Sequence, residues 1–237
     1  MTTPASPISV HVWSDIACPW CYIGKRRFER AVEQFGGEVT VEYHSFELAP
    51  DTPVDFEGSE VDFLSRHKGM PKAQVAQMLE HVTELAAAEG LDYDFDAVRH
   101  TKTLLAHQAL HHAKAEGKQL ELVERLFAAY FEEGRHTGRA EELTALAAEV
   151  GLDPEKLGEA LGAGTHAEAV QQDIDTARRY GIQGVPFYVI EGKYGISGAQ
   201  SSETFASALR RVTEERAQNP EPSQSPARGA APAGARR

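Results

Sequence analysis

The stretch that decides the fold is ISVHVWSDIACPWCYIG, residues 8–24. Apolar residues alternate with others over 8–13, which is typical of a strand with one buried face. Pro19 suits the first turn of a helix, where its missing N–H is not needed, so Cys18 is expected at the N-cap position. The sequence therefore predicts a strand and a short loop that lead into a helix, whose first turn carries both cysteines of the chain.

The residues after this stretch complete a βαβ unit. Helical spacing continues from Tyr22 to Phe35 and stops at the two glycines 36–37. A second alternating strand covers 39–46. Because strand, helix and strand in this order pair the strands in parallel, the cysteines are expected where an open parallel sheet keeps its active site.

The rest of the chain predicts an all-helical insertion followed by a return to the sheet. The loop 47–60 leads into helical patterns, and strand patterns return at 187–190 and 193–197 before a last helix. We predict an α/β domain made of 1–58 and 181–216, an inserted helical subdomain over 59–180, and a disordered tail over 217–237. The predicted helices of the insertion cover 71–88, 103–115, 119–133, 140–150, 154–161 and 165–180.

Composition and charge restrict the class of protein. The chain has 237 residues and a formal net charge of −12, which argues against binding to nucleic acid or to an anionic membrane. Residues 1–8 show no secretory signal, and no apolar run reaches transmembrane length. We therefore expect a cytoplasmic protein, in which a structural disulfide is improbable and a catalytic or metal-binding pair of cysteines is plausible.

The two cysteines are most simply a redox pair. The N-terminus of the following helix stabilises a thiolate at Cys18, because unpaired N–H groups and the helix dipole face it. We expect Cys18 to be poorly covered and to act as the nucleophile of thiol–disulfide exchange. Cys21 lies one turn further into the helix, where it is less exposed and can resolve a mixed disulfide.

Two other interpretations compete with the redox pair. A zinc site needs two further ligands, and the chain has no second CxxC. His107 and His111 are spaced i, i+4 on one predicted helix, but such a pair is more typical of a solvated helix face. The other interpretation, two inert buried cysteines, fits poorly with a proline at a βα turn. We therefore assign no metal site.

Gly184-Val185-Pro186, directly before the predicted strand 187–190, is the second informative motif. If the Val185–Pro186 bond is cis, this loop can lie against Cys18 and leave the backbone of Val185 free to pair with an extended substrate. A trans proline would simply end the loop. The residues alone do not decide between the two.

Together these motifs resemble the thioredoxin superfamily and, more closely, its DsbA branch. Within that branch the segments 14–24, 103–107 and 126–131 resemble the cytoplasmic FrnE-like dithiol–disulfide oxidoreductases or isomerases. The resemblance covers about 8–212 and implies a thioredoxin-like fold with a large inserted helical subdomain. It also implies that Cys18 attacks, that Cys21 resolves, and that Pro186 is a cis-proline beside them.

The resemblance also implies partners. We expect protein or small-molecule disulfides as substrates, bound by Pro19, Trp20, Val185 and Pro186 in a groove between the thioredoxin-like part and the insertion. No resident cofactor is expected beyond the Cys18–Cys21 disulfide, with glutathione as a candidate electron partner and a monomer or homodimer as the assembly. Because the middle pair is Pro-Trp and not the Pro-His of the periplasmic oxidants, their strong oxidising power is not carried over to this chain. The expected cytoplasmic location opposes net oxidation and favours reduction or isomerisation.

Two other functions stay open. The same architecture resembles glutathione-dependent kappa-class transferases and 2-hydroxychromene-2-carboxylate isomerases, although those typically carry serine at the position of Cys18. A holdase that binds partners through the helical subdomain is the non-enzymatic alternative.

Several residues near the motif have two interpretations each. Asp15 could pass protons to Cys21, or it could only form a local turn hydrogen bond, so we assign it no catalytic role. Trp20 could contact unfolded polypeptide or only shield the disulfide. Lys25, Arg26 and Arg27 are most simply the solvated face of the helix.

Overall fold

The fold is built on one mixed sheet of four strands in the order β2-β1-β3-β4. This computed structural model describes residues 6–218. Strand β1 (Ile8–Ser14) pairs in parallel with β2 (Val39–Ser45) and antiparallel with β3 (Phe187–Ile190). Strand β4 (Tyr194–Ser197) closes the predicted hairpin with β3. The βαβ unit and the C-terminal hairpin are thus confirmed.

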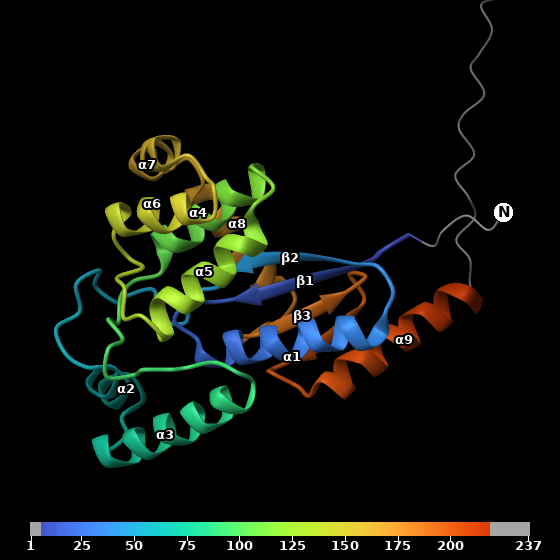
Figure 1. Cartoon of the computed structure of the whole chain (residues 1–237), viewed down its shortest axis with the longest axis horizontal. Helices are drawn as coiled ribbons and strands as arrows, with labels where there is room; N and C mark the ends of the chain where they lie inside the picture. Colours follow the sequence, from blue (N-terminus) through green and yellow to red (C-terminus); the bar gives the residue numbers. More distant parts are fainter. Residues whose placement is uncertain (1–5, 219–237) are drawn as a thin grey trace, which may run out of the picture.

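Helices α1 (Pro19–Phe35) and α9 (Ser202–Gln218) lie side by side along one face of the sheet (Figure 1). Val10 and Val12 point to this face and are fully buried. Phe28 of α1 meets Phe205 of α9 edge to face, with ring centroids 5.3 Å apart. Helix α9 includes residues 217 and 218, so the predicted tail begins two residues too early. The remainder of that tail, 219–237, lies outside the described residues.

The opposite face of the sheet is covered by helices from the predicted insertion. Contacts to β2 come from α5 and α8, and α4 packs between these two helices and the outer helices (Figure 1). Gln119 accepts a hydrogen bond from the amide of Tyr43 at 3.0 Å and donates to its carbonyl at 2.9 Å, which fixes α5 on β2. The helices of this layer are α4 (Leu104–Ala115), α5 (Gln119–Phe131), α6 (Ala140–Glu149), α7 (Pro154–Ala163) and α8 (Ala167–Arg179).

A separate pair of helices, α2 (Glu60–Lys68) and α3 (Lys72–Ala88), lies near the start of α1 (Figure 1). Helix α3 was predicted, whereas α2 was not. Helix α2 begins at a capping box, in which the Ser59 hydroxyl accepts from the amide of Asp62 and the Asp62 carboxylate accepts from the amide of Ser59. All helices from α2 to α8 fall between β2 and β3 in the chain. The division into the domains 1–58 with 181–216 and 59–180 stays a prediction.

Within residues 6–218, no helix combines the length and the apolar character needed to cross a bilayer.

Candidate active site

The site begins where β1 passes through a short loop into α1. Cys18 occupies the N-cap position with an extended backbone, and Pro19 is the first helical residue, as the sequence predicts. The amide of Cys21 donates to the carbonyl of Cys18 at 3.0 Å, so the two cysteines are one helical turn apart. Both are free thiols. The side chain of Cys18 makes no capping hydrogen bond to the first amides of α1.

The two thiols differ in their surroundings. Cys18 is 4% exposed, so the expectation that it is poorly covered is wrong, and Cys21 is 2% exposed. Cys18 nevertheless borders a cavity of about 200 Å³, and Cys21 does not. Burial, together with the neighbouring Cys18, raises the pKa of the Cys21 thiol well above its ordinary value. Cys21 is therefore protonated at neutral pH in the reduced state, and Cys18 is the thiol that a ligand in the cavity meets.

The loop before β3 lies against Cys18, although 167 residues separate them in the chain. The Cys18 thiol donates to the carbonyl oxygen of Val185, with Sγ and O 3.5 Å apart. The Val185–Pro186 peptide bond is cis. The motifs CPWC and GVP, which the sequence offered as separate signals, thus form one site.

Gly24 allows this close approach. A Cβ atom at this position would lie 2.8 Å from the hydroxyl oxygen of Tyr188 and 3.1 Å from Cγ of Pro186. Tyr188 is fully buried and has little freedom to move away. A glycine one turn after Cys21 therefore lets α1 pack directly on the loop that carries Val185 and Pro186.

The cavity beside Cys18 is largely apolar. Trp20 borders it and is 38% exposed, which places its ring at the surface of the groove. Pro19 stands between Cys18 and Trp20 in the chain, and its carbonyl accepts a hydrogen bond from the hydroxyl of Tyr93 at 2.7 Å. The far wall comes from α2 and α3 through Phe63, Leu64, His67, Met78, Leu79 and Val82. The cavity lies between the start of α1 and the pair α2 and α3, where the resemblance implies a groove, and α2, which the sequence did not reveal, forms much of it.

Asp15 is an anchor for the loop that carries the cysteines. Its carboxylate accepts hydrogen bonds from the amide of Leu48 at 2.8 Å and from Ala17 at 3.4 Å, and it lies 3.4 Å from Nε2 of His107. Burial raises the pKa of Asp15, but its hydrogen bond to His107 and the amide of Leu48 outweigh burial, so the net pKa lies below its ordinary value. Asp15 is therefore ionised at neutral pH, which favours the local hydrogen-bonding role over proton transfer.

The two histidines weighed above as zinc ligands, His107 and His111, do not approach the cysteines. His107 is 1% exposed, and its Nε2 lies 3.1 Å from the carbonyl of Phe46. His111 contacts Asp173 and Ser45. The expectation of a solvated helix face is wrong for both side chains. Among residues 6–218, no set of three ligand atoms that could hold a metal includes either thiol.

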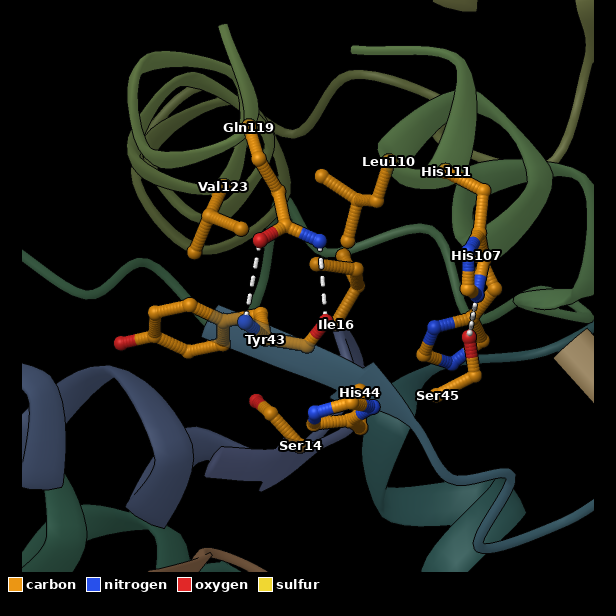
Figure 2. A pocket seen from close by; sticks show the side chains of 10 residues that line it. All are labelled: Ser14, Ile16, Tyr43, His44, Ser45, His107, Leu110, His111, Gln119 and Val123. Carbon is orange, nitrogen blue, oxygen red and sulfur yellow. Dashed lines mark hydrogen bonds between the residues drawn. The ribbon is translucent and has the colours of Figure 1, made fainter. Parts of the chain in front are cut away.

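A second, very small cavity lies behind His107, where the ends of β1 and β2 meet α4 and α5 (Figure 2). Its volume of about 10 Å³ matches a single water molecule. Two buried atoms on residues that line it, Oγ of Ser14 and Nδ1 of His107, have no hydrogen-bond partner among the described residues.

The start of α1 is also fixed from the side of α5. Lys25 is 6% exposed and pairs with Glu29 and Glu124, and Arg26 pairs with Glu124 as well. The prediction of a solvated face is therefore wrong for Lys25. No local pattern could have shown this, because Glu124 is 99 residues away in the chain.

The comparison with protein families decides the classification. The model of the DSBA-like thioredoxin domain matches residues 9–210. The chain belongs to this family. The protein YwbO of Bacillus subtilis, described as uncharacterized, is 32% identical over 204 residues, which cover 85% of this chain and 96% of that protein.

Comparison with solved structures agrees with this assignment. The probable DsbA oxidoreductase SCO1869 of Streptomyces coelicolor is 37% identical, with a TM-score of 0.81 over 88% of this chain and 91% of that one. Two more distant structures share the fold of this DSBA-like chain. A 2-hydroxychromene-2-carboxylate isomerase has a TM-score of 0.67 at 18% identity, and the match covers 89% of this chain and 98% of that one. The cytosolic disulfide reductase DsbM of Pseudomonas aeruginosa, solved with GSH, has a TM-score of 0.63 at 21% identity. The match covers 87% of this chain and 99% of that one.

Proposed function

We propose that this DSBA-like protein is a thiol–disulfide oxidoreductase that reduces or isomerises disulfides of proteins or small molecules. One observation carries the proposal: of the two free thiols at the start of α1, only Cys18 borders the apolar cavity. The same thiol contacts the carbonyl of Val185. A substrate disulfide placed in the cavity would therefore meet Cys18 first.

The reaction follows from this asymmetry. The Cys18 thiolate attacks one sulfur of the substrate disulfide, forms a mixed disulfide, and expels the other substrate sulfur as a thiolate that takes up a proton. Cys21 then loses its proton and attacks Cys18. This closes the Cys18–Cys21 disulfide and releases the second substrate thiol. The substrate gains two electrons and two protons, and the enzyme loses the same number.

Cys21 suits the resolving role. Its raised pKa keeps the thiol protonated in the reduced enzyme, so it does not compete with Cys18 for the substrate at neutral pH. Its amide is held one turn from Cys18, which fixes the geometry of the internal attack.

Substrate binding would use the groove and the loop before β3. An extended substrate segment can pair with the backbone of Val185, next to Pro186, while its apolar side chains contact Trp20 and Pro19. The apolar lining favours unfolded or partly folded polypeptide as the protein substrate. The cycle needs an external thiol to reduce the enzyme again, and glutathione in the cytoplasm is the donor that we propose.

Reduction of insulin by dithiothreitol, followed by turbidity, tests the proposal. We expect the wild-type chain to accelerate precipitation and Cys18→Ser to reduce the rate to that of dithiothreitol alone. His81→Ala is a matched surface control, because His81 is exposed on α3 and outside the groove, and should behave like the wild type. Full activity of Cys18→Ser would contradict the proposal.

The alternative function is that of a glutathione-dependent transferase or a 2-hydroxychromene-2-carboxylate isomerase. One observation favours it, the fold shared with the structure of such an isomerase. Two free thiols in the position described here favour the redox cycle instead. Tight binding of glutathione by a chain that shows no dithiol redox cycle would reverse this preference.

A further inference from the structure

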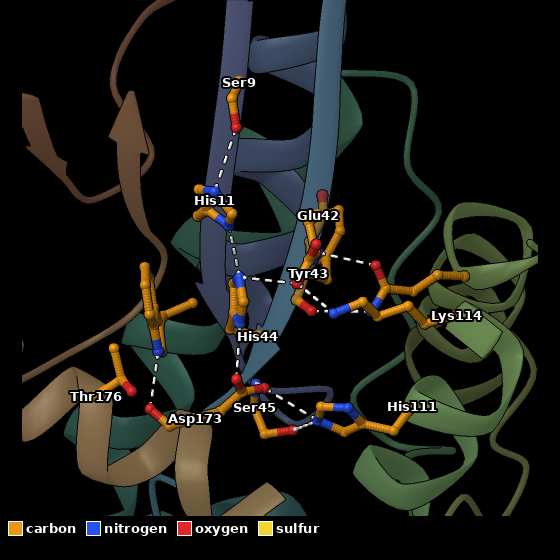
Figure 3. A network of polar contacts seen from close by, with 12 residues as sticks. Ser9, His11, Glu42, Tyr43, His44, Ser45, His111, Lys114, Asp173 and Thr176 are labelled. Atoms are coloured by element: carbon orange, nitrogen blue, oxygen red, sulfur yellow. Dashed lines mark hydrogen bonds and ion pairs between the residues drawn. The ribbon is translucent and has the colours of Figure 1, made fainter. Parts of the chain in front are cut away.

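A cluster of potential metal ligands lies on the face of the sheet opposite α1 and α9. His11 of β1 is in register with Glu42 of β2, and Trp13 is in register with His44. These side chains alternate with the buried Val10 and Val12, so they project from the other face. Nδ1 of His11, Nε2 of His44 and a carboxylate oxygen of Glu42 all lie within 4.8 Å of one another (Figure 3).

The orientation of His44 is set by a carboxylate. Its Nδ1 lies 2.7 Å from Oδ1 of Asp173, and a carboxylate only accepts hydrogen bonds, so this nitrogen carries the proton. In the neutral ring, Nε2 then presents its lone pair to the centre of the cluster. A histidine held in this way by a carboxylate is the usual arrangement of a metal ligand.

The three groups converge on one point. Nε2 of His44 lies 2.8 Å from Nδ1 of His11 and 3.3 Å from Oε1 of Glu42. A single proton between the two rings satisfies the first contact, and the Glu42 oxygen then lies beside an unprotonated nitrogen and takes its hydrogen bond from Lys114. The outer nitrogen of His11, Nε2, lies 3.2 Å from the hydroxyl of Ser9, which can accept its proton when Nδ1 becomes a ligand.

We propose that His11, Glu42 and His44 bind a divalent transition metal ion of the zinc class, with water as the fourth ligand. Two imidazoles and one carboxylate form a common ligand set for zinc, and ligand atoms around a tetrahedral zinc ion are about 3.3 Å apart. The separation of 3.3 Å between His44 and Glu42 already fits, and the two imidazoles need to move apart by about half an ångström. The ion would join β1 to β2 and, through Asp173, to α8.

Lys114 competes with the ion for Glu42. Its ammonium group pairs with the same carboxylate oxygen, but the lysine side chain is 44% exposed and can turn into water. His111 contacts the other carboxylate oxygen of Asp173, Oδ2, and does not enter the cluster. The proposal does not depend on the redox function, since the thiols take no part in it.

Calorimetric titration with Zn²⁺ and visible absorption with Co²⁺ test the site. The sample is an untagged Cys18→Ala/Cys21→Ala double variant, so that the thiols cannot bind metal. We expect one ion per chain, tetrahedral Co²⁺ absorption bands, and a rise in Tm of about 5–10 °C at a hundredfold excess over Kd. Absence of saturable binding would overturn the proposal.

Single substitutions in that background locate the ion. We expect His11→Ala and His44→Ala to abolish binding and Asp173→Asn to weaken it by roughly 10–100-fold, because only the orientation of His44 is lost. His112→Ala is the control, since His112 contacts His166 instead of the cluster. Unchanged affinity in His11→Ala and His44→Ala would place the ion elsewhere and overturn the assignment.

Lys114→Met separates a metal site from a simple hydrogen bond between two histidines. Removing the competing ammonium should tighten Zn²⁺ binding, whereas Lys118→Met, which changes the net charge equally at a lysine paired with Glu121, should not. Equal affinities in the two variants would exclude Glu42 as a ligand. Trp13, stacked on His44 at 4.6 Å, supplies an independent signal, because Co²⁺ should quench its fluorescence in a Trp20→Phe variant.

Discussion

Two histidine–carboxylate clusters join the sheet to the helices, and they differ in how much water reaches them. In the inner cluster, His107 and Asp15 have side chains only 1% and 3% exposed. In the outer cluster, His44 and Asp173 are both 13% exposed, and Glu42 is 32% exposed. The inner pair lies beside the cysteine loop, whereas the outer pair lies where β2 meets α8 (Figure 3).

This difference in exposure separates two roles. A buried carboxylate must have all its acceptors satisfied, and Asp15 is occupied by Leu48, Ala17 and His107, so it can only hold the loop in place. In the outer cluster, one potential ligand atom each from His11, Glu42 and His44 lie within 4.8 Å of one another, which suits a bound ion. Similar residue types thus act as an anchor in one place and as a candidate binding site in the other.

Truncation of the two carboxylates should show the largest difference. We expect Asp15→Ala to reduce the free energy of unfolding by about 3–5 kcal/mol, because it leaves two amides without their acceptor and a buried histidine with only the carbonyl of Phe46. Asp173→Ala should cost about 1–3 kcal/mol, since water can reach the groups that it leaves. Urea denaturation of the reduced protein without added metal measures both.

Asp15→Asn is the matched control for the inner cluster. It keeps an oxygen for the amide of Leu48 and removes only the charge, so it should be less destabilising than Asp15→Ala. A loss in Asp173→Ala equal to or larger than that in Asp15→Ala would contradict the comparison.

In the pH dependence of stability, Asp173 should have a larger effect than Asp15, which is the opposite of the order expected for truncation. Burial raises the pKa of Asp173, but hydrogen bonds from His111 and His44 lower it far more, and the net shift is downward and large. A carboxyl whose pKa is lower in the folded state contributes stability above its unfolded pKa, and that stability is lost as the pH falls towards the folded pKa. Asp15 is shifted in the same direction, with burial opposing the shift.

We therefore expect the acid limb of the stability curve, below about pH 4, to be flattened more by Asp173→Asn than by Asp15→Asn. The limiting slope for one group is about 1.4 kcal/mol per pH unit. Unfolding by urea at a series of pH values checks this order. A flatter acid limb in Asp15→Asn than in Asp173→Asn would show that Asp15 carries the larger shift.

The sequence predicts the elements that have a strong local signal. The alternation over 8–13 and the proline after Cys18 correctly place β1, α1 and the N-cap. Helix α2 was missed, because Glu60 is its only buried residue and no apolar stripe marks it. The capping pair Ser59 and Asp62 was the one available signal.

Local patterns did not predict most contacts between distant segments. The resemblance implies that Pro186 lies beside the cysteines, but the wall that α2 and α3 add to the groove at Cys18 had no signal in the sequence. The contact of His107 with Asp15 likewise joins an N-terminal loop to α4. Helical periodicity indicates that a position is polar or apolar, but it does not indicate which segment covers it.

The central claim is that Cys18 starts the chemistry and Cys21 completes it. The most direct test is intact mass measurement after Cys18→Ser and Cys21→Ser are each incubated with glutathione disulfide. We predict that Cys21→Ser gains one glutathionyl group, because its mixed disulfide cannot be resolved, and that Cys18→Ser remains unmodified, because the buried and protonated Cys21 does not attack. Modification of Cys18→Ser with no modification of Cys21→Ser would contradict the account.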